Sequence, residues 1–258
     1  NDLRESQSLS DTTKTGIDTV SISKNLKTWK IRAENVHEFA FCADPNFIVD
    51  ICNYNNTIIK SYYTKSTKDR WQYKAADQTR KAIKLFSENY YSYPYGQFST
   101  IASLVDGGME YPQLVMISGH YGEDNKYDSG LESTIAHEVA HNWFYGLLGF
   151  NETEQAFLDE GLASFATIQY MEYYHGRFHN NYSYDKKWQR LLLPNSSERD
   201  ENYRIYIERA ISRQEDPLLT PADQYIDAGR YFNASYDKAA AIYFMLQYTM
   251  STEKFDRL

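Results

Sequence analysis

Residues 131–167 read LESTIAHEVAHNWFYGLLGFNETEQAFLDEGLASFAT, and this stretch decides how the chain folds. His137, Glu138 and His141 form an H-E-x-x-H motif, and Glu160 follows with eighteen residues between it and His141. Positions i and i+4 of a helix lie about 40° apart around its axis, so histidines at this spacing can bind one metal ion. The stretch therefore predicts two helices that meet at a metal site.

The first of these helices has two distinct faces. Ile135, Val139, Trp143 and Leu147 recur at four-residue steps and form an apolar stripe opposite the histidines, which we expect the core to bury. Glu138 flanks the metal-binding face, where it is badly placed for chelation but well placed to take a proton from a metal-bound water. The pattern therefore predicts that Glu138 is a general base and not a ligand.

A third ligand has to come from outside the motif. Zinc in a catalytic site takes three protein ligands and keeps its fourth position for water. Glu160 is the candidate, because it shares a helix face with Ser164 and Thr167 while the apolar residues point away. We expect one Zn²⁺ per chain, held by His137, His141 and Glu160, with the two ligand helices packed side by side. The alternative, a chance motif, is expected about 0.01 times in a chain of this composition.

The composition excludes several classes of protein. The chain has 258 residues, 42% of them hydrophobic and 24% charged, which is typical of a globular protein with a large core. A net charge of −8 without clustered Lys or Arg argues against nucleic-acid binding. No run approaches the roughly 18 apolar residues of a membrane span. Peptides are the partners that this composition leaves open.

Neither the ends of the chain nor its cysteines fix a compartment. The first residues show no signal-peptide pattern and no initiator Met, so we expect a processed or cut piece of a longer protein. Cys42 and Cys52 could close a ten-residue loop, but two cysteines do not make a disulfide framework. Their pairing, the localisation and the oligomeric state are left open by the sequence.

The rest of the chain divides into a strand-rich and a helix-rich part. Residues 1–16 are polar and predict a loose lead-in, and residues 106–112 predict a break between strands. Alternating apolar and polar residues predict strands at residues 20–23, 29–32, 47–51, 57–63, 98–105 and 113–117. Three- and four-residue periodicity predicts helices at residues 68–90, 184–193, 202–212 and 236–250. This order predicts an α+β fold with the metal between a sheet lobe and a helical lobe.

Four short motifs, in a fixed order, resemble the catalytic domain of the aminopeptidase N family, zinc peptidases with a thermolysin-like fold. The motifs are Gly107-Gly108-Met109-Glu110, residues 137–143, residues 159–161 and Tyr236-Asp237-Lys238. The resemblance covers residues from about 30 to the end. It implies a small mixed sheet lobe followed by a helical lobe in residues 34–258, truncated before a C-terminal helical domain. Residues 1–33 would then be the lead-in and remnant strands of an upstream β domain.

The resemblance also implies roles for individual residues. Glu110 would bind the free α-amine of the substrate, since a carboxylate forms a charge-assisted hydrogen bond with an ammonium group. The backbone of Gly107, Gly108 and Met109 would pair with the peptide as an edge strand. For these residues the alternative is a plain turn that carries a carboxylate.

By the same resemblance, Tyr236 would stabilise the oxyanion. We expect it near the start of a helix, after residues 233–235, where the helix dipole would assist. The alternative is an ordinary core tyrosine, with Tyr231 or Tyr225 in the oxyanion role. The sequence departs from the family pattern at Ala239, where glycine is usual, and at Asp159, where many members have asparagine. The first departure leaves open a shift of the helix that carries Tyr236.

These patterns together predict a zinc-dependent aminopeptidase. It would hydrolyse the N-terminal bond of peptides with a free N-terminus through zinc-activated water, with Glu138 as general base. The alternatives are an endopeptidase, a glycyl-type aminopeptidase of another branch, or a peptide-binding module whose catalysis has lapsed. The sequence does not determine the preferred N-terminal residue.

Overall fold

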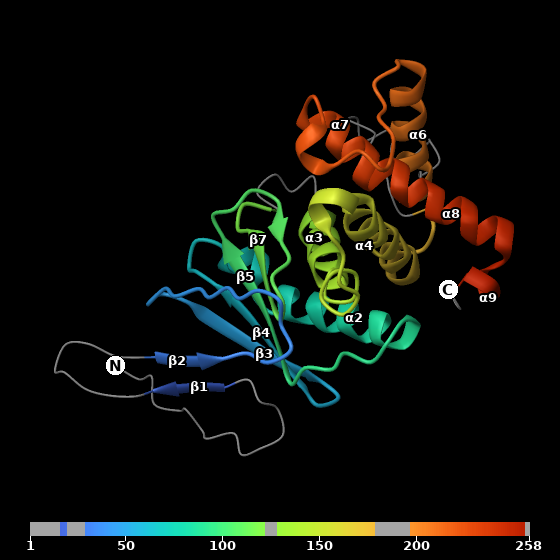
Figure 1. Ribbon diagram of the computed structural model, residues 1–258. Coiled ribbons are helices and arrows are strands. Elements are labelled where there is room, and N and C mark those ends of the chain that lie inside the picture. The colour runs from blue at the N-terminus through green and yellow to red at the C-terminus, as the bar shows by residue number, and fades with distance from the viewer. Residues whose placement is uncertain (1–15, 20–28, 122–127, 179–196, 256–258) are drawn as a thin grey trace.

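A mixed five-stranded sheet forms one half of the molecule (Figure 1). The computed structural model describes residues 16–19, 29–121, 128–178 and 197–255. The strand order is β3-β4-β5-β7-β6; β4, β5 and β7 are parallel, while β3 and β6 run antiparallel at the two edges. The strands are β3 (Ile48–Tyr54), β4 (Thr57–Tyr63), β5 (Gln97–Ser103), β6 (Gly108–Met109) and β7 (Leu114–Ser118).

Helices α2 (Lys74–Asn89) and α3 (Asp128–Ala140) pack against this sheet and against each other (Figure 1). The buried face of α2 is apolar apart from Thr79, whose hydroxyl lies 2.8 Å from that of Thr100 on β5. The fully buried side chains of Ile59, Phe86 and Ile135 join sheet and helices in one core. Helix α3, which carries the H-E-x-x-H motif, is thereby held in place by the core that it shares with the sheet and α2.

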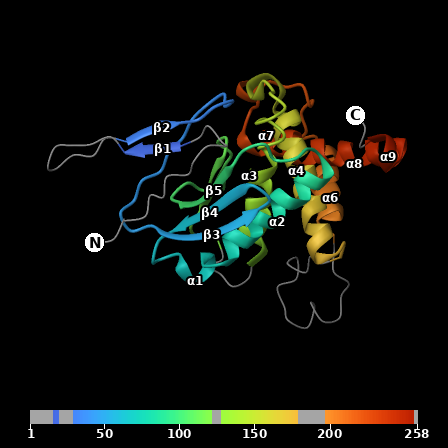
Figure 2. The ribbon, with the colours of Figure 1, turned by 90° about the horizontal axis from the view of Figure 1, so that it is seen from below.

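The C-terminal half is helical and lies beyond α3 (Figures 1 and 2). Helix α4 (Glu152–His175) packs on α3 and contacts the last helices of the chain. A second, smaller core is formed by Phe165, Ile168, Ala240 and Phe244. The remaining elements are α6 (Glu198–Ile211), η1 (Ala222–Gln224), α7 (Ala228–Phe232), η2 (Asn233–Lys238), α8 (Ala239–Met250) and α9 (Thr252–Phe255). The sequence prediction of a mixed sheet followed by helices is confirmed.

The predicted helix over residues 68–90 is interrupted. It consists of α1 (Lys68–Trp71) and α2, with Tyr73 between them in the left-handed region at φ 62°. The N–H of Tyr73 donates to Asp50 Oδ2 on β3 at 2.5 Å. A hydrogen bond to a distant strand therefore replaces the bond that the N–H of Tyr73 would donate within a continuous helix. The periodicity of the sequence does not reveal such a contact.

Other boundaries also differ from the prediction. The strand at residues 57–63 is confirmed, whereas the expected break at residues 106–112 contains the short strand β6. Helix α6 begins four residues before the expected start, because Ser197 caps it by accepting from the N–H of Asp200 at 3.0 Å. The expected lead-in through residue 15, the strand at 20–23 and the helix at 184–193 lie outside the described residues.

At the N-terminal side, β1 (Gly16–Thr19) and β2 (Trp29–Arg32) form a separate antiparallel pair. Their assignment to an upstream domain stays a prediction. Cys42 and Cys52 are free thiols. Within the described ranges, no helix is long and apolar enough to cross a membrane.

Candidate metal centre and active site

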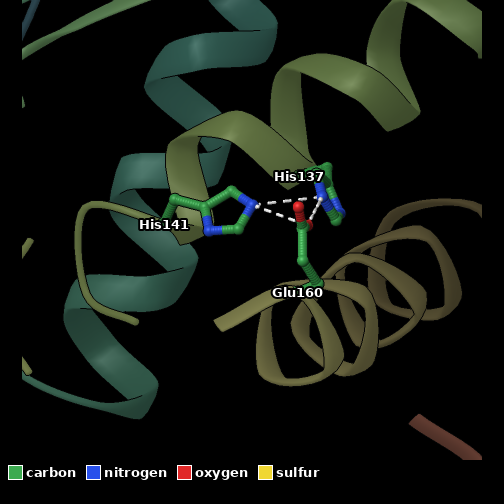
Figure 3. A group of neighbouring side chains, drawn as sticks. All are labelled: His137, His141 and Glu160. Carbon is green, nitrogen blue, oxygen red and sulfur yellow. Dashed lines mark hydrogen bonds and ion pairs between the residues drawn. The ribbon is translucent and has the colours of Figure 1, made fainter. Parts of the chain in front are cut away.

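His137, His141 and Glu160 converge on one point between α3 and α4 (Figure 3). The two Nε2 atoms lie 3.1 Å apart, and Glu160 Oε2 lies 3.1 Å from His137 Nε2 and 3.3 Å from His141 Nε2. Three ligands of a tetrahedral zinc ion, each at about 2.0–2.1 Å, lie roughly 3.3 Å from one another. The donor set and its spacing therefore fit zinc.

Packing of the two helices fixes these three side chains. Ile135 and Val139, opposite the histidines on α3, are fully buried as the sequence predicts. The expected stripe does not continue as a helix, because α3 ends at Ala140, and Trp143 and Leu147 follow in turns. One further helical hydrogen bond, from the N–H of His141 to the carbonyl of His137 at 3.3 Å, keeps His141 in register.

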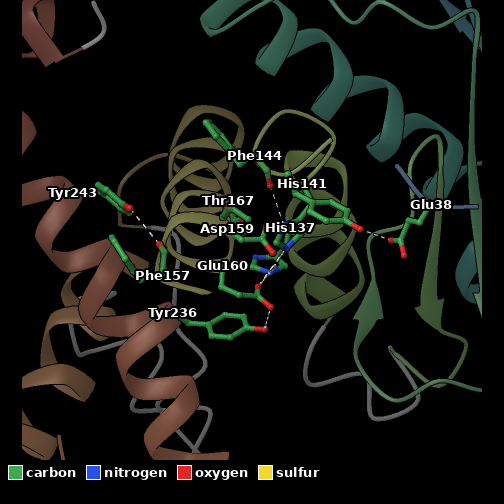
Figure 4. A network of polar contacts seen from close by, with 12 residues as sticks. Glu38, His137, His141, Phe144, Phe157, Asp159, Glu160, Thr167, Tyr236 and Tyr243 are labelled. Carbon is green, nitrogen blue, oxygen red and sulfur yellow. Dashed lines mark hydrogen bonds and ion pairs between the residues drawn. The ribbon is translucent and has the colours of Figure 1, made fainter. Parts of the chain in front are cut away.

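Asp159 supports the second histidine (Figure 4). Its Oδ1 lies 2.5 Å from His141 Nδ1, and both side chains are buried. A carboxylate on this nitrogen fixes the tautomer, leaving Nε2 free to bind a metal, and it orients the ring. From the sequence, Asp159 stands out only as a departure from the family motif. Its position directly before Glu160 was the available signal.

Glu138 is buried beside the three candidate ligands, and it also forms a possible metal-binding group with Glu110 and His141. Its Oε2 has no hydrogen-bond partner among the described residues, which leaves it free to receive a proton. Burial raises the pKa of Glu138 to about 7; His137 and His141 lower it, and Glu110 raises it. A carboxyl with a pKa near neutrality is suited to both taking and giving a proton.

The β6 strand lies directly over Glu138. A Cβ atom added at Gly108 would sit 2.1 Å from Glu138 Oε1, so a larger residue there would displace the Glu138 side chain from its present position. Gly107 precedes it with a φ of +78°, a conformation that favours glycine. Gly108 and Met109 pair with Ile117 and Met116 of β7, and their strand is the edge of the sheet. The glycines therefore serve both a turn and a close approach.

Glu110 follows this strand and reaches the same site. Its carboxylate lies within 4.8 Å of donor atoms of Glu138 and His141, and equally of Asp159 and Glu160. Burial raises the pKa of Glu110, with further effects from the neighbouring charges. A fourth carboxylate, after those of Glu138, Asp159 and Glu160, is thus placed beside His141 and Glu160, where it can meet a cation.

Tyr236 also lies at the site (Figure 4). Its hydroxyl donates to Glu160 Oε1, and its ring stacks on His137 with the centroids 5.6 Å apart. The expected position near a helix start is wrong: Tyr236 lies inside a π-helical segment, η2, that joins α7 to α8 without a break. No helix N-terminus therefore adds its dipole here. Tyr231 is the next ring, with its centroid 6.0 Å from that of Tyr236.

Comparison with known families decides the class of the protein. The family described as "Peptidase family M1 domain" matches residues 74–258, which include all of the site residues above. The chain belongs to peptidase family M1. This membership confirms the resemblance to the aminopeptidase N family and the prediction of a metallopeptidase.

One curated relative supports the same assignment. The chain is 24% identical, over 205 residues, to the protein named Leucine aminopeptidase 2 of Emericella nidulans. The alignment covers 78% of this chain and 30% of the relative. The chain therefore spans about a third of the length of that protein.

Ala239, the departure from the family motif, is accommodated without loss of the Tyr236 contact. Ala239 is buried on α8 against Gly161 of α4, where a Cβ atom on the glycine would lie 2.4 Å from that of Ala239. The glycine next to Glu160 therefore makes room for the alanine. The M1 domain keeps α4 and α8 in close contact with these two residues.

A cavity of about 520 Å³ opens from the candidate metal centre of the M1 domain. His137 and Glu138 line it at one end, together with Gly107 and Gly108. Ser164 and Thr167 line it on α4, as the predicted helix face requires. Residues from α6 and η2 form the opposite wall. The sequence did not predict this wall, because only the tertiary fold brings α6 to the site.

Proposed function

We propose that this M1 domain is a zinc-dependent aminopeptidase that removes N-terminal residues from peptides with a free amine. The observation that carries the proposal is the grouping of three zinc-compatible donors, a buried base and a further carboxylate in one site. Zinc held by His137, His141 and Glu160 would supply Lewis acidity to the attacking water and to the scissile carbonyl.

The chain's own residues supply the remaining chemistry. Glu138 takes a proton from the attacking water and returns it to the leaving nitrogen, which its pKa of about 7 permits. Tyr236 donates a hydrogen bond to the oxygen that gains negative charge in the transition state. Burial and the charge of Glu160 raise the pKa of Tyr236 well above its usual range, so the hydroxyl keeps its proton at any working pH.

Substrate orientation follows from the edge strand and the carboxylate after it. The exposed side of β6 offers backbone N–H and C=O groups to an extended peptide. Glu110 pairs with the α-amine and thereby places the first peptide bond at the metal centre. The thermolysin-like arrangement and the division into residues 1–33 and 34–258 belong to this proposal.

Two measurements on the purified chain test the proposal. Zinc content is measured by elemental analysis, and hydrolysis is followed with a panel of aminoacyl amides, each free and N-acetylated. We expect one zinc per chain and turnover of the free amides alone. Equal turnover of both forms would favour an endopeptidase, and peptide binding without turnover would favour a module whose catalysis has lapsed.

A further inference from the structure

The cavity extends away from Glu110. Its lining includes His137, Glu138 and Gly108, but Glu110 is not part of it. If the substrate amine is held at Glu110, as the proposed function requires, the cavity lies on the other side of the scissile bond. It therefore receives the residues that follow the bond, and its walls act on their side chains.

The far wall of the cavity is acidic. Glu198, Glu201 and Asp237 line it, Asp106 adds a fourth carboxylate beside Gly107, and no Lys or Arg of the described residues lines the cavity. Glu201 is paired with Arg204, whose side chain is 52% exposed. An exposed pair of this kind holds its ions only weakly. The wall therefore keeps negative charge that a cation in the cavity could neutralise.

Asp237 is a carboxylate of this wall that combines burial with a neutral hydrogen-bond partner. The partner of its side chain is a neutral amide, Asn202 Nδ2 at 3.3 Å, and it makes no ion pair with any described residue. Burial raises its pKa to about 6, although the bond from Asn202 and the charge of Arg209 lower it. A half-buried carboxylate without a cation gains from any cation that reaches it.

Asn202 gives an independent sign of a missing partner. Its side chain is only 7% exposed, lines the cavity, and leaves Oδ1 without a hydrogen-bond donor among the described residues. Buried polar atoms are usually satisfied, and an unpaired one calls for a ligand group. Because Oδ1 accepts hydrogen bonds, the missing group is a donor, as an ammonium or guanidinium group is.

Apolar side chains also line the cavity. They are Ile168, Ile205 and Phe232, and Ile205 lies on the same helix α6 as Glu198 and Glu201. Long basic side chains have an aliphatic stem and a charged head, and they bury the stem on such surfaces. A cavity lined by both apolar and acidic side chains matches such a stem and head.

We propose that this cavity is a subsite for a lysine or arginine side chain on the C-terminal side of the scissile bond, with Asp237 and Asn202 binding its charged head. The enzyme would then prefer peptides whose residue after the cleaved bond is basic. This inference rests on the proposed function for its direction along the peptide, and on the cavity wall for its charge.

Binding to the zinc-loaded Glu138→Gln variant, whose turnover is expected to be ~10²- to 10⁴-fold slower than that of the parent, tests the subsite. The probes are Ala-Lys-Ala-Ala and Ala-Nle-Ala-Ala, in which norleucine keeps the stem of lysine without its charge, and titration calorimetry gives both Kd values. We expect the lysine peptide to bind at least about tenfold more tightly, as for a hydrogen bond between charged groups. Adding Asp237→Asn should bring the ratio below about threefold.

Asp223→Asn is the matched control, since it removes the same charge from an exposed position on η1. It should leave the lysine preference unchanged. Equal binding of the two peptides would overturn the subsite, as would a preference that survives Asp237→Asn. A lysine preference in a protein that cleaves free and acetylated peptides equally would instead contradict the proposed exopeptidase. If neither peptide binds, both proposals fail.

Discussion

The two ligand helices and the π-helical segment build different parts of one site by different means. On α3, the i and i+4 spacing of a regular helix aims two histidines at one point, and the buried stripe behind them keeps the helix in place. The residues that would handle substrate lie next to or within irregular backbone: Gly108 begins a two-residue strand directly after Gly107, which has a positive φ, and Tyr236 lies in a π-helix. Regular structure thus positions the metal donors, and irregular structure positions the groups around the substrate.

Glu138→Gln is the strongest test of the division between ligands and base. The glutamine has the same shape but cannot take a proton, so we expect kcat to fall by ~10²- to 10⁴-fold. Zinc content should stay at one per chain, because the three proposed ligands are intact. Loss of zinc from this variant, measured by elemental analysis, would show that Glu138 is a ligand.

Tyr236→Phe tests the irregular part of the site. It removes one donor to the transition state, so we expect kcat to fall ~10²- to 10³-fold with little change in KM or zinc content. Tyr231→Phe is the control on a neighbouring ring, and it should have a much smaller effect. If the two variants exchange these results, Tyr231 has the oxyanion role.

Asp159→Ala tests the support of the metal centre. Loss of a carboxylate behind a metal-binding histidine costs ~10- to 100-fold in metal affinity. We expect zinc to dissociate correspondingly more easily in a chelator competition, a readout that does not depend on turnover. Asp159→Asn keeps a hydrogen-bond acceptor and should recover part of the affinity. Unchanged affinity in the alanine variant would limit Asp159 to a packing role.

Asp237→Asn is expected to have the smallest effect of these variants, a change in the free energy of unfolding. Burial raises the pKa of Asp237 to about 6, so the folded protein binds this proton more tightly than the unfolded chain does. Protonated Asp237 therefore contributes to the stability of the folded state. This contribution is fully present below pH ~4 and is lost as the pH rises through about 6. The facing charges are Arg209 and Glu201.

The variant removes this ionisation. In urea unfolding of the metal-free protein, its free energy of unfolding should exceed that of the parent by about 1–2 kcal/mol at pH 7.5 and by little at pH 4. Asp223→Asn should show no such pH-dependent difference. The same gain at both pH values would contradict the assigned cause.

The local motifs were predictable from the sequence, and the long-range contacts were not. Spacing alone identified His137, His141 and Glu160, because helix geometry converts sequence distance into direction. Tyr73 interrupts a helix through a hydrogen bond with Asp50 on a strand, and Asn202 reaches the cavity only through the packing of α6. Neither contact leaves a periodic trace along the chain.

The π-helical segment at residues 233–238 has a consequence for how this region can vary in length. A π turn holds one residue more than an α turn, so removing one residue would restore a regular helix through α7 and α8. Each residue turns a helix by about 100°, so the deletion would rotate Tyr236 away from Glu160 or rotate Ala239 away from Gly161. Related chains that keep both contacts must keep the extra residue. An alignment gap within this segment therefore marks a change in the active site, even where every aligned residue is identical.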